Sequence, residues 1–156
     1  MNLDVLILRD PRESPKKCSL TPLRGRPGVQ FVEFKAGRRI DGEGRILLHP
    51  DGPELSGEDV RGAGGIPCAG LLLLDCSWRR LPSLLAAVDG EPVRRRLPPL
   101  FTAYPRKSQV FQDPDQGLAS IEALYAAFAL LGEPRPDLLE GYRWRAEFLE
   151  RNPELV

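Results

Sequence analysis

Residues 70–78 read Gly-Leu-Leu-Leu-Leu-Asp-Cys-Ser-Trp, and this stretch decides how the rest of the chain is interpreted. Four consecutive leucines are typical of a strand that is buried on both faces, as in the centre of a parallel sheet. Asp75 ends the apolar run, and Ser77 can cap a helix that we expect at about residues 78–88. Ligands bind at the carboxyl ends of the strands in open parallel sheets, so Asp75 and Trp78 stand where a ligand site is expected.

Strand and helix patterns alternate on either side of this stretch. Strands are predicted at residues 3–8, 29–34, 45–48 and 97–103, and a turn at residues 49–52. Helices are predicted at residues 118–131, with Ser120 as the N-cap, and at about 137–151. In the second helix the residues expected to face inward are Leu138, Leu139, Tyr142, Phe148 and Leu149. This alternation predicts an α/β layered fold with a mainly parallel sheet, and 156 residues favour a single domain.

Composition and motifs exclude several classes of protein. Three cysteines and a single histidine, His49, argue against a zinc site and a disulfide framework and fit a reduced, cytoplasmic setting. We expect no signal peptide, and the longest apolar run is too short to span a bilayer. The chain has no Gly-x-Gly-x-x-Gly and no phosphate-loop motif, so a Rossmann dinucleotide site or an NTPase is not expected.

Charge is balanced overall but uneven along the chain. Lys plus Arg and Asp plus Glu are 22 each, whereas residues 9–39 contain nine basic and three acidic side chains. Residues 79–107 contain seven basic and two acidic side chains. If these two stretches converge in space, they form a local anion-binding face on a neutral protein. The alternative is that both are solvated, arginine-rich loops without a partner.

The residues around Asp75 allow more than one kind of chemistry. A carboxylate at a strand end can accept hydrogen bonds from ribose hydroxyls or lie near a cation, and Trp78 offers a flat apolar wall. Alternatively, Asp75 caps a helix and Trp78 belongs to the core. A nucleophilic Cys76 would need His49 nearby. We interpret Cys76 as a small buried residue, His49 as a turn residue, and Glu122 as a structural acid at a helix start.

Four stretches of the chain, taken in order, are GLLLLDCSWRR (70–80), LPPLFTAYP (97–105), LASIEALYAAFALLG (118–132) and GYRWRAEFLERN (141–152). Together they resemble the archaeal and eukaryotic small-subunit ribosomal RNA aminocarboxypropyltransferases. The Lys-Lys-Cys-Ser of residues 16–19 and parts of residues 47–56 resemble weaker N-terminal blocks of that family. The most specific feature is Asp-Cys-Ser-Trp followed by the Ser-x-Glu-Ala helix.

The same two blocks also resemble the DTW-domain enzymes, which attach the same group to transfer RNA uridines. Residues 104–106, Tyr-Pro-Arg, are closer to the loop of those enzymes than to that of the ribosomal family. Both resemblances imply S-adenosylmethionine as the cofactor. They leave two RNA targets open: small-subunit ribosomal RNA, free or in the pre-ribosome, and transfer RNA.

The resemblance implies a SPOUT-like knotted α/β fold, which periodicity alone would not predict because true knots are rare. It implies a small N-terminal α/β part at residues 1–66 and a cofactor-binding part at residues 67–156, joined in one compact unit. It places Ser19 near the amino-acid tail of the cofactor, Leu48 and Pro50 against the adenosine, and Trp78 against the methyl group. The implied adenine-binding loop and helix start contain Leu100, Thr102, Ala103, Tyr104, Leu118 and Ser120.

The implied reaction moves the 3-amino-3-carboxypropyl group of S-adenosylmethionine to a uridine or pseudouridine and releases methylthioadenosine. Asp75 is then either the general base or only a ribose ligand. We expect a monomer without metal ion or membrane association. RNA phosphates would be bound by Lys16, Lys17, Arg24, Arg26, Arg79, Arg80, Arg94, Arg95, Arg96, Arg106 and Lys107. The alternatives are the same transfer to transfer RNA, a non-catalytic ribosome-assembly factor, and a methyltransferase of knotted fold.

Overall fold

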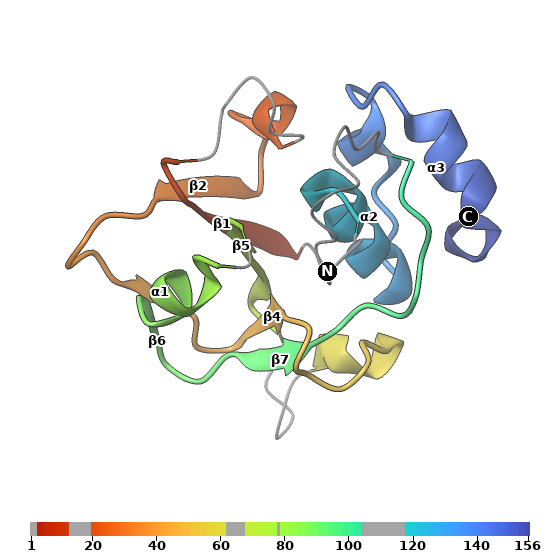
Figure 1. The fold of residues 1–156 in the computed structure, drawn as a ribbon. Helices are drawn as coiled ribbons and strands as arrows, with labels where there is room; N and C mark the ends of the chain where they lie inside the picture. Colours follow the sequence, from red (N-terminus) through yellow and green to blue (C-terminus); the bar gives the residue numbers. More distant parts are fainter. Residues whose placement is uncertain (1–2, 13–19, 62–67, 78, 104–117) are drawn as a thin grey trace.

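Five parallel strands form the sheet at the centre of the molecule (Figure 1). The computed structural model describes residues 3–12, 20–61, 68–77, 79–103 and 118–156. The sheet has the order β2-β1-β5-β4-β7, and every neighbouring pair in it is parallel. Its strands are β1 (Asp4–Arg9), β2 (Val29–Glu33), β4 (Arg45–Leu48), β5 (Gly70–Asp75) and β7 (Val93–Arg95). The predicted α/β class with a mainly parallel sheet is confirmed.

The central strand β5 has the double burial that its leucines predict. All six of its residues are buried. Leu71 and Leu73 belong to the core on one face of the sheet, whereas Leu72 and Leu74 belong to a second core on the other face. Side chains alternate between the two faces of a strand, so both cores depend on this one segment.

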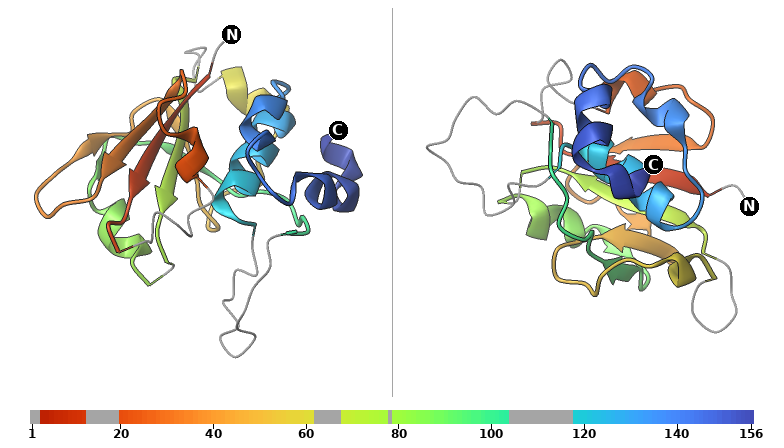
Figure 2. Two further views of the ribbon diagram at one scale, coloured as in Figure 1. Left: turned by 90° about the horizontal axis from the view of Figure 1, so that it is seen from above. Right: turned by 90° about the vertical axis from the view of Figure 1, so that its right-hand side faces the viewer.

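One face of the sheet is covered by α2 (Ser120–Leu130), seven of whose eleven residues are buried. Figure 2 shows α2 between the sheet and a C-terminal segment that forms a third layer. This segment contains the 3₁₀ turns η4 (Pro136–Leu139) and η5 (Pro153–Leu155) and the helix α3 (Arg145–Arg151). As predicted, the apolar residues Leu138, Leu139, Tyr142 and Phe148 are buried, and Leu149 packs partly against the same core.

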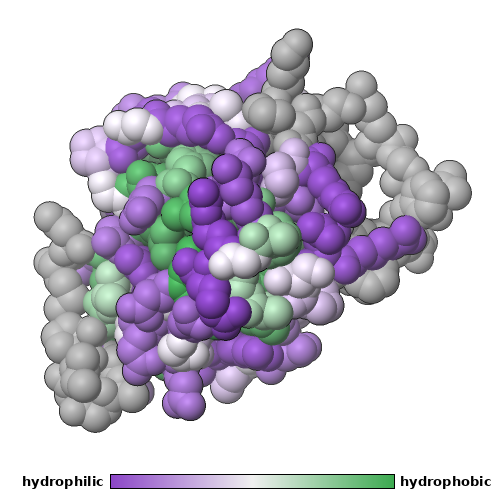
Figure 3. All heavy atoms as spheres, turned by 90° about the vertical axis from the view of Figure 1, so that its left-hand side faces the viewer, coloured by the Kyte–Doolittle hydropathy of each residue, from purple (hydrophilic) through white to green (hydrophobic). Residues whose placement is uncertain are grey.

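The opposite face carries less cover. It is packed by the short helix α1 (Leu81–Leu85) and by a separate parallel pair, β3 (Ile40–Asp41) and β6 (Val88–Asp89). Two further 3₁₀ turns lie between strands of the sheet: η1 (Thr21–Leu23) between β1 and β2, and η2 (Gly57–Arg61) between β4 and β5. Figure 3 views the side of the molecule that carries α1 and shows apolar residues at its surface, surrounded by hydrophilic ones.

Three predicted elements are wrong in kind or in extent. Residues 97–103 form no strand; the last strand of the sheet is β7, and the chain runs irregularly after Arg96. Pro98 and Pro99 lack the N–H groups that a ladder needs, which explains this difference. The helix expected at 78–88 is only α1, and Ser77 does not cap it, because Arg80 holds the N-cap position.

The helix expected at 137–151 is divided into η4 and α3 by a turn around Gly141. At the start of α2, Ala119 takes the N-cap position that was predicted for Ser120, and Ser120 is the first helical residue. The strand bounds predicted for 45–48 and the turn at 49–52 are confirmed. In the part of the chain that is described, no helix has both the length and the apolar character that a bilayer crossing needs.

Candidate functional site at the carboxyl edge of the sheet

Asp75 lies at the carboxyl edge of the sheet, where β1 and β5 end side by side. Arg9 and Asp75 are register partners on these two strands. The Asp75 side chain is 9% exposed, and its Oδ2 lies 3.8 Å from Nε of Arg9. Its Oδ1 accepts a hydrogen bond from the Ser120 hydroxyl at 3.1 Å. The structure therefore brings together two predicted site residues, and it joins the end of the central strand to the first turn of α2.

Arg9 is a buried cation that the sequence interpretation did not include in the site. It is 4% exposed, and its Nη2 donates to Thr21 Oγ1 at 3.3 Å. Its Nη1 is buried and has no hydrogen-bond partner in the structure as described. A buried guanidinium normally uses its donors fully, so this nitrogen is suited to a polar ligand group at the same edge.

Four apolar side chains, here called the apolar rim, come from segments that reach this edge: Leu48 ends β4, Leu100 and Ala103 lie in the chain after β7, and Leu118 lies two residues before Ser120. Leu48, Leu100, Ala103 and Leu118 are each partly buried and pack against the core cluster on the α2 side of the sheet. These are four of the residues for which the family resemblance implies contacts with the adenosine. Pro50 is exposed in the turn after β4, where the Gly52 N–H donates to the His49 carbonyl oxygen.

His49 has a local role in that turn. It is buried, and its Nδ1 accepts a hydrogen bond from the Asp51 N–H at 3.1 Å. Its backbone N–H donates to the Arg95 carbonyl oxygen and so continues the pairing of β4 with β7. The interpretation of His49 as a turn residue is confirmed by these contacts.

Residues 100–103 lie across the start of α2 and are fixed by side chains rather than by a strand ladder. Glu122 accepts hydrogen bonds from the Thr102 hydroxyl at 2.6 Å and from the Ala103 N–H at 2.9 Å. Asn152 donates to the Phe101 carbonyl oxygen and accepts from the Phe101 N–H, both at 2.8 Å. The predicted residues Leu100, Thr102 and Ala103 are thus held in a defined conformation.

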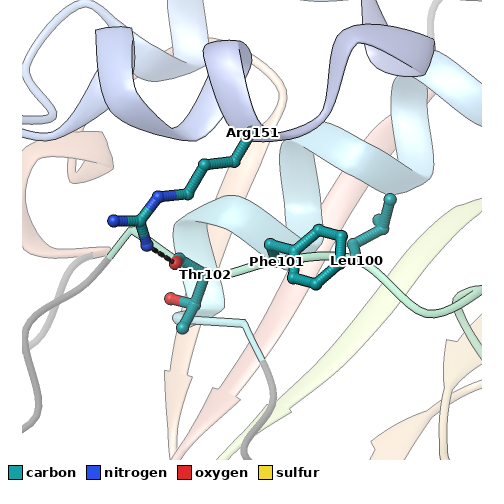
Figure 4. Close-up of a pocket in the computed structure, with 4 residues that line it drawn as sticks. All are labelled: Leu100, Phe101, Thr102 and Arg151. Carbon is teal, nitrogen blue, oxygen red and sulfur yellow. Dashed lines mark hydrogen bonds between the residues drawn. The ribbon is translucent and has the colours of Figure 1, made fainter.

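A surface pocket of about 440 Å³ lies beside this loop and is lined by Leu100, Phe101, Thr102 and Arg151 (Figure 4). In the figure Arg151 reaches from the end of α3 to the Thr102 carbonyl oxygen, to which it donates at 2.6 Å. Phe101 is 68% exposed at the pocket. The lining contains neither Asp75 nor Leu48, so this hollow is separate from the edge of the sheet around Asp75.

The predicted RNA-binding arginines fall into two groups. Arg26, Arg80 and Arg95 form ion pairs within the protein, with Glu140, Asp10 and Asp59 respectively. By contrast, Arg24, Arg79, Arg94 and Arg96 are exposed.

The two basic stretches meet only in part. Arg80 lies over the Phe34 ring at 5.6 Å and pairs with Asp10, so it joins the first stretch. Arg94, Arg95 and Arg96 lie at or next to β7, which is the opposite edge of the sheet from β2. Those edges are about 19 Å apart at the usual strand spacing of about 4.8 Å.

Several predicted residues lie outside the residues that the structure describes. They are Lys16, Lys17, Ser19, Trp78, Tyr104, Arg106 and Lys107.

The described ranges contain no group of three or more His, Cys, Asp or Glu side chains that could hold a metal ion. Cys76 packs partly against the core on the α1 side. Burial raises the pKa of the Cys68 thiol, which contacts the Gly70 carbonyl oxygen at the start of β5.

A parallel α/β sheet with a buried acid, a buried cation and an apolar rim at its carboxyl edge defines a ligand-binding α/β protein. Residues 46–156 match the family model described as "Ribosome biogenesis protein, C-terminal". The chain belongs to this family, because the match covers well over half of it.

Two curated relatives are named 16S rRNA aminocarboxypropyltransferase. The protein from Vulcanisaeta distributa is 28% identical over 97% of this chain and 79% of its own length. The protein from Methanosphaera stadtmanae is 27% identical over 99% of this chain and 86% of its own length. A solved structure, the SAM-dependent rRNA:acp-transferase Tsr3 from Vulcanisaeta distributa, matches with a TM-score of 0.73. It is 29% identical, and the match covers 99% of this chain and 80% of that one.

Proposed function

We propose that this protein transfers the 3-amino-3-carboxypropyl group of S-adenosylmethionine to a uridine or pseudouridine of small-subunit ribosomal RNA. The observation that carries this proposal is the likeness to the Vulcanisaeta rRNA:acp-transferase over 99% of the chain, at 29% identity. The two curated relatives, named for the same transfer, support it over nearly the whole chain. None of these relatives is named for transfer RNA, so ribosomal RNA is the favoured target.

The residues at the carboxyl edge fit S-adenosylmethionine in chemical type. The apolar rim of Leu48, Leu100, Ala103 and Leu118 suits the adenosine. The carboxylate of Asp75 suits ribose hydroxyls or the positive sulfonium, and the unpartnered Nη1 of Arg9 suits a carboxylate. The cosubstrate carries all of these groups, and the site supplies an opposite or matching group for each.

The transfer exchanges a carbon–sulfur bond for a carbon–nitrogen bond and moves one proton. A ring nitrogen of the base attacks the γ-carbon of the amino-acid tail, the bond from this carbon to sulfur breaks, and methylthioadenosine leaves. The nitrogen loses its proton, and Asp75 is the described carboxylate that we assign to accept it. Most of the rate enhancement comes from holding the tail and the base in line.

RNA binding is assigned to the exposed arginines. Arg24, Arg79, Arg94 and Arg96 are exposed to solvent, and each can neutralise a phosphate. Lys16, Lys17, Arg106 and Lys107 remain candidates for the same role. We expect the target base to be single-stranded or turned out of its helix, because a site at a sheet edge cannot reach a base inside the deep groove of an RNA duplex.

Finer aspects of the molecule belong to the same proposal. We infer a SPOUT-like knotted chain, an N-terminal part at residues 1–66, a cofactor-binding part at 67–156, a monomer and a cytoplasmic location with the ribosomal RNA. The likeness to the Vulcanisaeta structure supports the fold. A crystal structure tests the knot by showing whether the C-terminal chain passes through a loop, and light scattering tests the monomer.

Labelled cosubstrate tests the reaction. The protein is incubated with small-subunit ribosomal RNA, or with transfer RNA, and with S-adenosylmethionine labelled at the carboxyl carbon or at the methyl carbon. We expect ribosomal RNA to gain label only from the carboxyl carbon. Label from the methyl carbon would mean a methyltransferase. Label in transfer RNA alone would mean that transfer RNA, not ribosomal RNA, is the substrate. Cofactor binding without transfer would mean an assembly factor.

A further inference from the structure

Glu122 is a buried carboxylate near the candidate site that accepts four hydrogen bonds. It lies in the first turn of α2 and is 0% exposed. Its Oε1 accepts hydrogen bonds from the Thr102 hydroxyl at 2.6 Å and the Ala119 N–H at 2.8 Å. Its Oε2 accepts from the Ala103 N–H and the Tyr142 hydroxyl, both at 2.9 Å. One side chain thus joins the loop, the helix start and the C-terminal segment.

The usual reason for an acid at this position does not explain its burial. A glutamate that complements the helix dipole does so at the surface, where its charge remains hydrated. Burying a carboxylate is costly unless hydrogen bonds replace the lost water. Here four donors converge on two oxygens, and two of these donors belong to Thr102 and Ala103. The arrangement is therefore built around the loop as well as around the helix.

The loop depends on such contacts because it has no strand partner. Residues 97–103 run irregularly after β7, and Pro98 and Pro99 cannot donate to a sheet. Glu122 satisfies the backbone N–H of Ala103, and Ala103 packs on the apolar rim with Leu100. The position of Leu100 and Ala103 relative to Asp75 therefore depends on the hydrogen bonds that Glu122 accepts.

We propose that Glu122 is a positioning residue that sets the conformation of residues 100–103 for S-adenosylmethionine. This inference rests on the proposed function. Glu122 acts through Thr102 and Ala103, and it keeps the loop docked on the same helix start whose Ser120 holds Asp75. Loss of the carboxylate would then weaken cosubstrate binding in a protein that is still folded.

Two hydroxyl deletions on the same carboxylate separate positioning from simple stability. Thr102→Val removes the bond from the loop, whereas Tyr142→Phe removes the bond from the C-terminal segment. At a temperature where every variant is folded, we expect Thr102→Val and Glu122→Gln to raise the Kd for S-adenosylmethionine about tenfold. We expect Tyr142→Phe to lower the melting temperature with a Kd within about twofold of wild type.

Two further variants test whether the Thr102 hydroxyl acts through Glu122. Thr102→Ser keeps the hydroxyl and should restore wild-type affinity. The double variant with Thr102→Val and Glu122→Gln should be no weaker than the worse single variant, because both remove the same interaction. Additive losses, or equal losses in Thr102→Val and Tyr142→Phe, would overturn the positioning role.

Hydrogen exchange reads the loop without any cosubstrate. The Ala103 amide should exchange faster in Glu122→Gln and Thr102→Val than in wild type or Tyr142→Phe. An Ala103 exchange rate in Glu122→Gln equal to that of wild type overturns the inference, whatever the affinity for the cosubstrate. A wild-type protein that binds no S-adenosylmethionine contradicts the proposed function instead, and the exchange rates still decide whether Glu122 holds the loop.

Discussion

The Asp75 side chain contacts residues of two other elements, and each contact has a chemical consequence. Arg9 supplies a positive charge from the neighbouring strand, and Ser120 donates a hydrogen bond from α2. A carboxylate held in this way has a fixed orientation, which a base or a ribose ligand needs. Because Asp75 is buried beside Arg9, removal of its negative charge alters the electrostatics of the site and leaves the protein surface almost unchanged.

Replacing Asp75 separates its two assigned roles. Asp75→Asn keeps the shape and removes the proton acceptor, so we expect turnover to fall at least about 100-fold. The Kd for S-adenosylmethionine should change less than about tenfold. Asp10→Asn, at the end of the neighbouring strand, is the matched control, because Asp10 is buried and pairs with Arg80. Normal turnover with a much weaker Kd would make Asp75 a ribose ligand only.

Arg9 leads to a prediction about the tail of the cosubstrate. We expect wild-type protein to bind S-adenosylmethionine at least about tenfold more tightly than its decarboxylated analogue, because the analogue has no partner for the free Nη1. Arg9→Gln should lose this preference and still bind methylthioadenosine. Calorimetry with the three ligands measures it. A preference that survives in Arg9→Gln would leave Arg9 as a structural partner of Asp75.

At the scale of single residues, the sequence allowed Asp75 and Ser120 to be predicted, since a strand end and a helix start are visible in the pattern. Arg9 and Glu122 were not predicted as site residues, although Glu122 lies in the predicted helix and Arg9 directly follows the strand predicted at residues 3–8. Their roles depend on partners that are distant in sequence. Arg9 lies 66 positions from Asp75, and Tyr142 lies 20 positions from Glu122. No local periodicity reports such pairs.

Among the elements, the buried strands were predictable and the connections were not. The sequence patterns of β5 and β4 favour a buried strand over any other element. The short strands β3, β6 and β7 contain two or three residues each, which is too few for a period to appear. The break between η4 and α3 depends on a turn at Gly141 inside an otherwise helical pattern.

The turn after β4 is tied to β7 by close backbone packing. A Cβ added at Gly52 would lie 2.5 Å from the Arg94 carbonyl carbon and oxygen, so an alanine there must displace the sheet edge. We expect Gly52→Ala to destabilise the protein by about 1–3 kcal/mol in urea unfolding. Gly57→Ala is the control, because its nearest neighbour is at an ordinary 3.6 Å. Equal stabilities of the two variants would contradict this packing.

At the scale of the whole molecule, the described arginines of the two basic stretches lie toward opposite edges of the sheet rather than on one face. Sequence counts predicted the basic stretches, but only the strand order shows that β2 and β7 lie at opposite edges. An RNA that contacts both edges and also enters the site at Asp75 must span the width of the sheet. The arrangement therefore fits a substrate that is held on two sides of the site.

Charge reversal tests this arrangement. Arg94→Glu should weaken ribosomal RNA binding and lower the slope of log K against log salt by about 0.7–0.9 for one lost phosphate contact. Arg24→Glu, near the other edge, should have a similar effect. Arg145→Glu in α3 is exposed and is the control. Binding that responds to none of these changes would assign RNA recognition to other residues.

The by-product of the reaction is the most direct test of the account. When the protein, S-adenosylmethionine and small-subunit ribosomal RNA are incubated together, mass spectrometry identifies the nucleoside that is released. Aminocarboxypropyl transfer predicts methylthioadenosine, in an amount equal to the modified uridine. Release of S-adenosylhomocysteine would contradict the account, because it would show that the methyl group had been transferred instead.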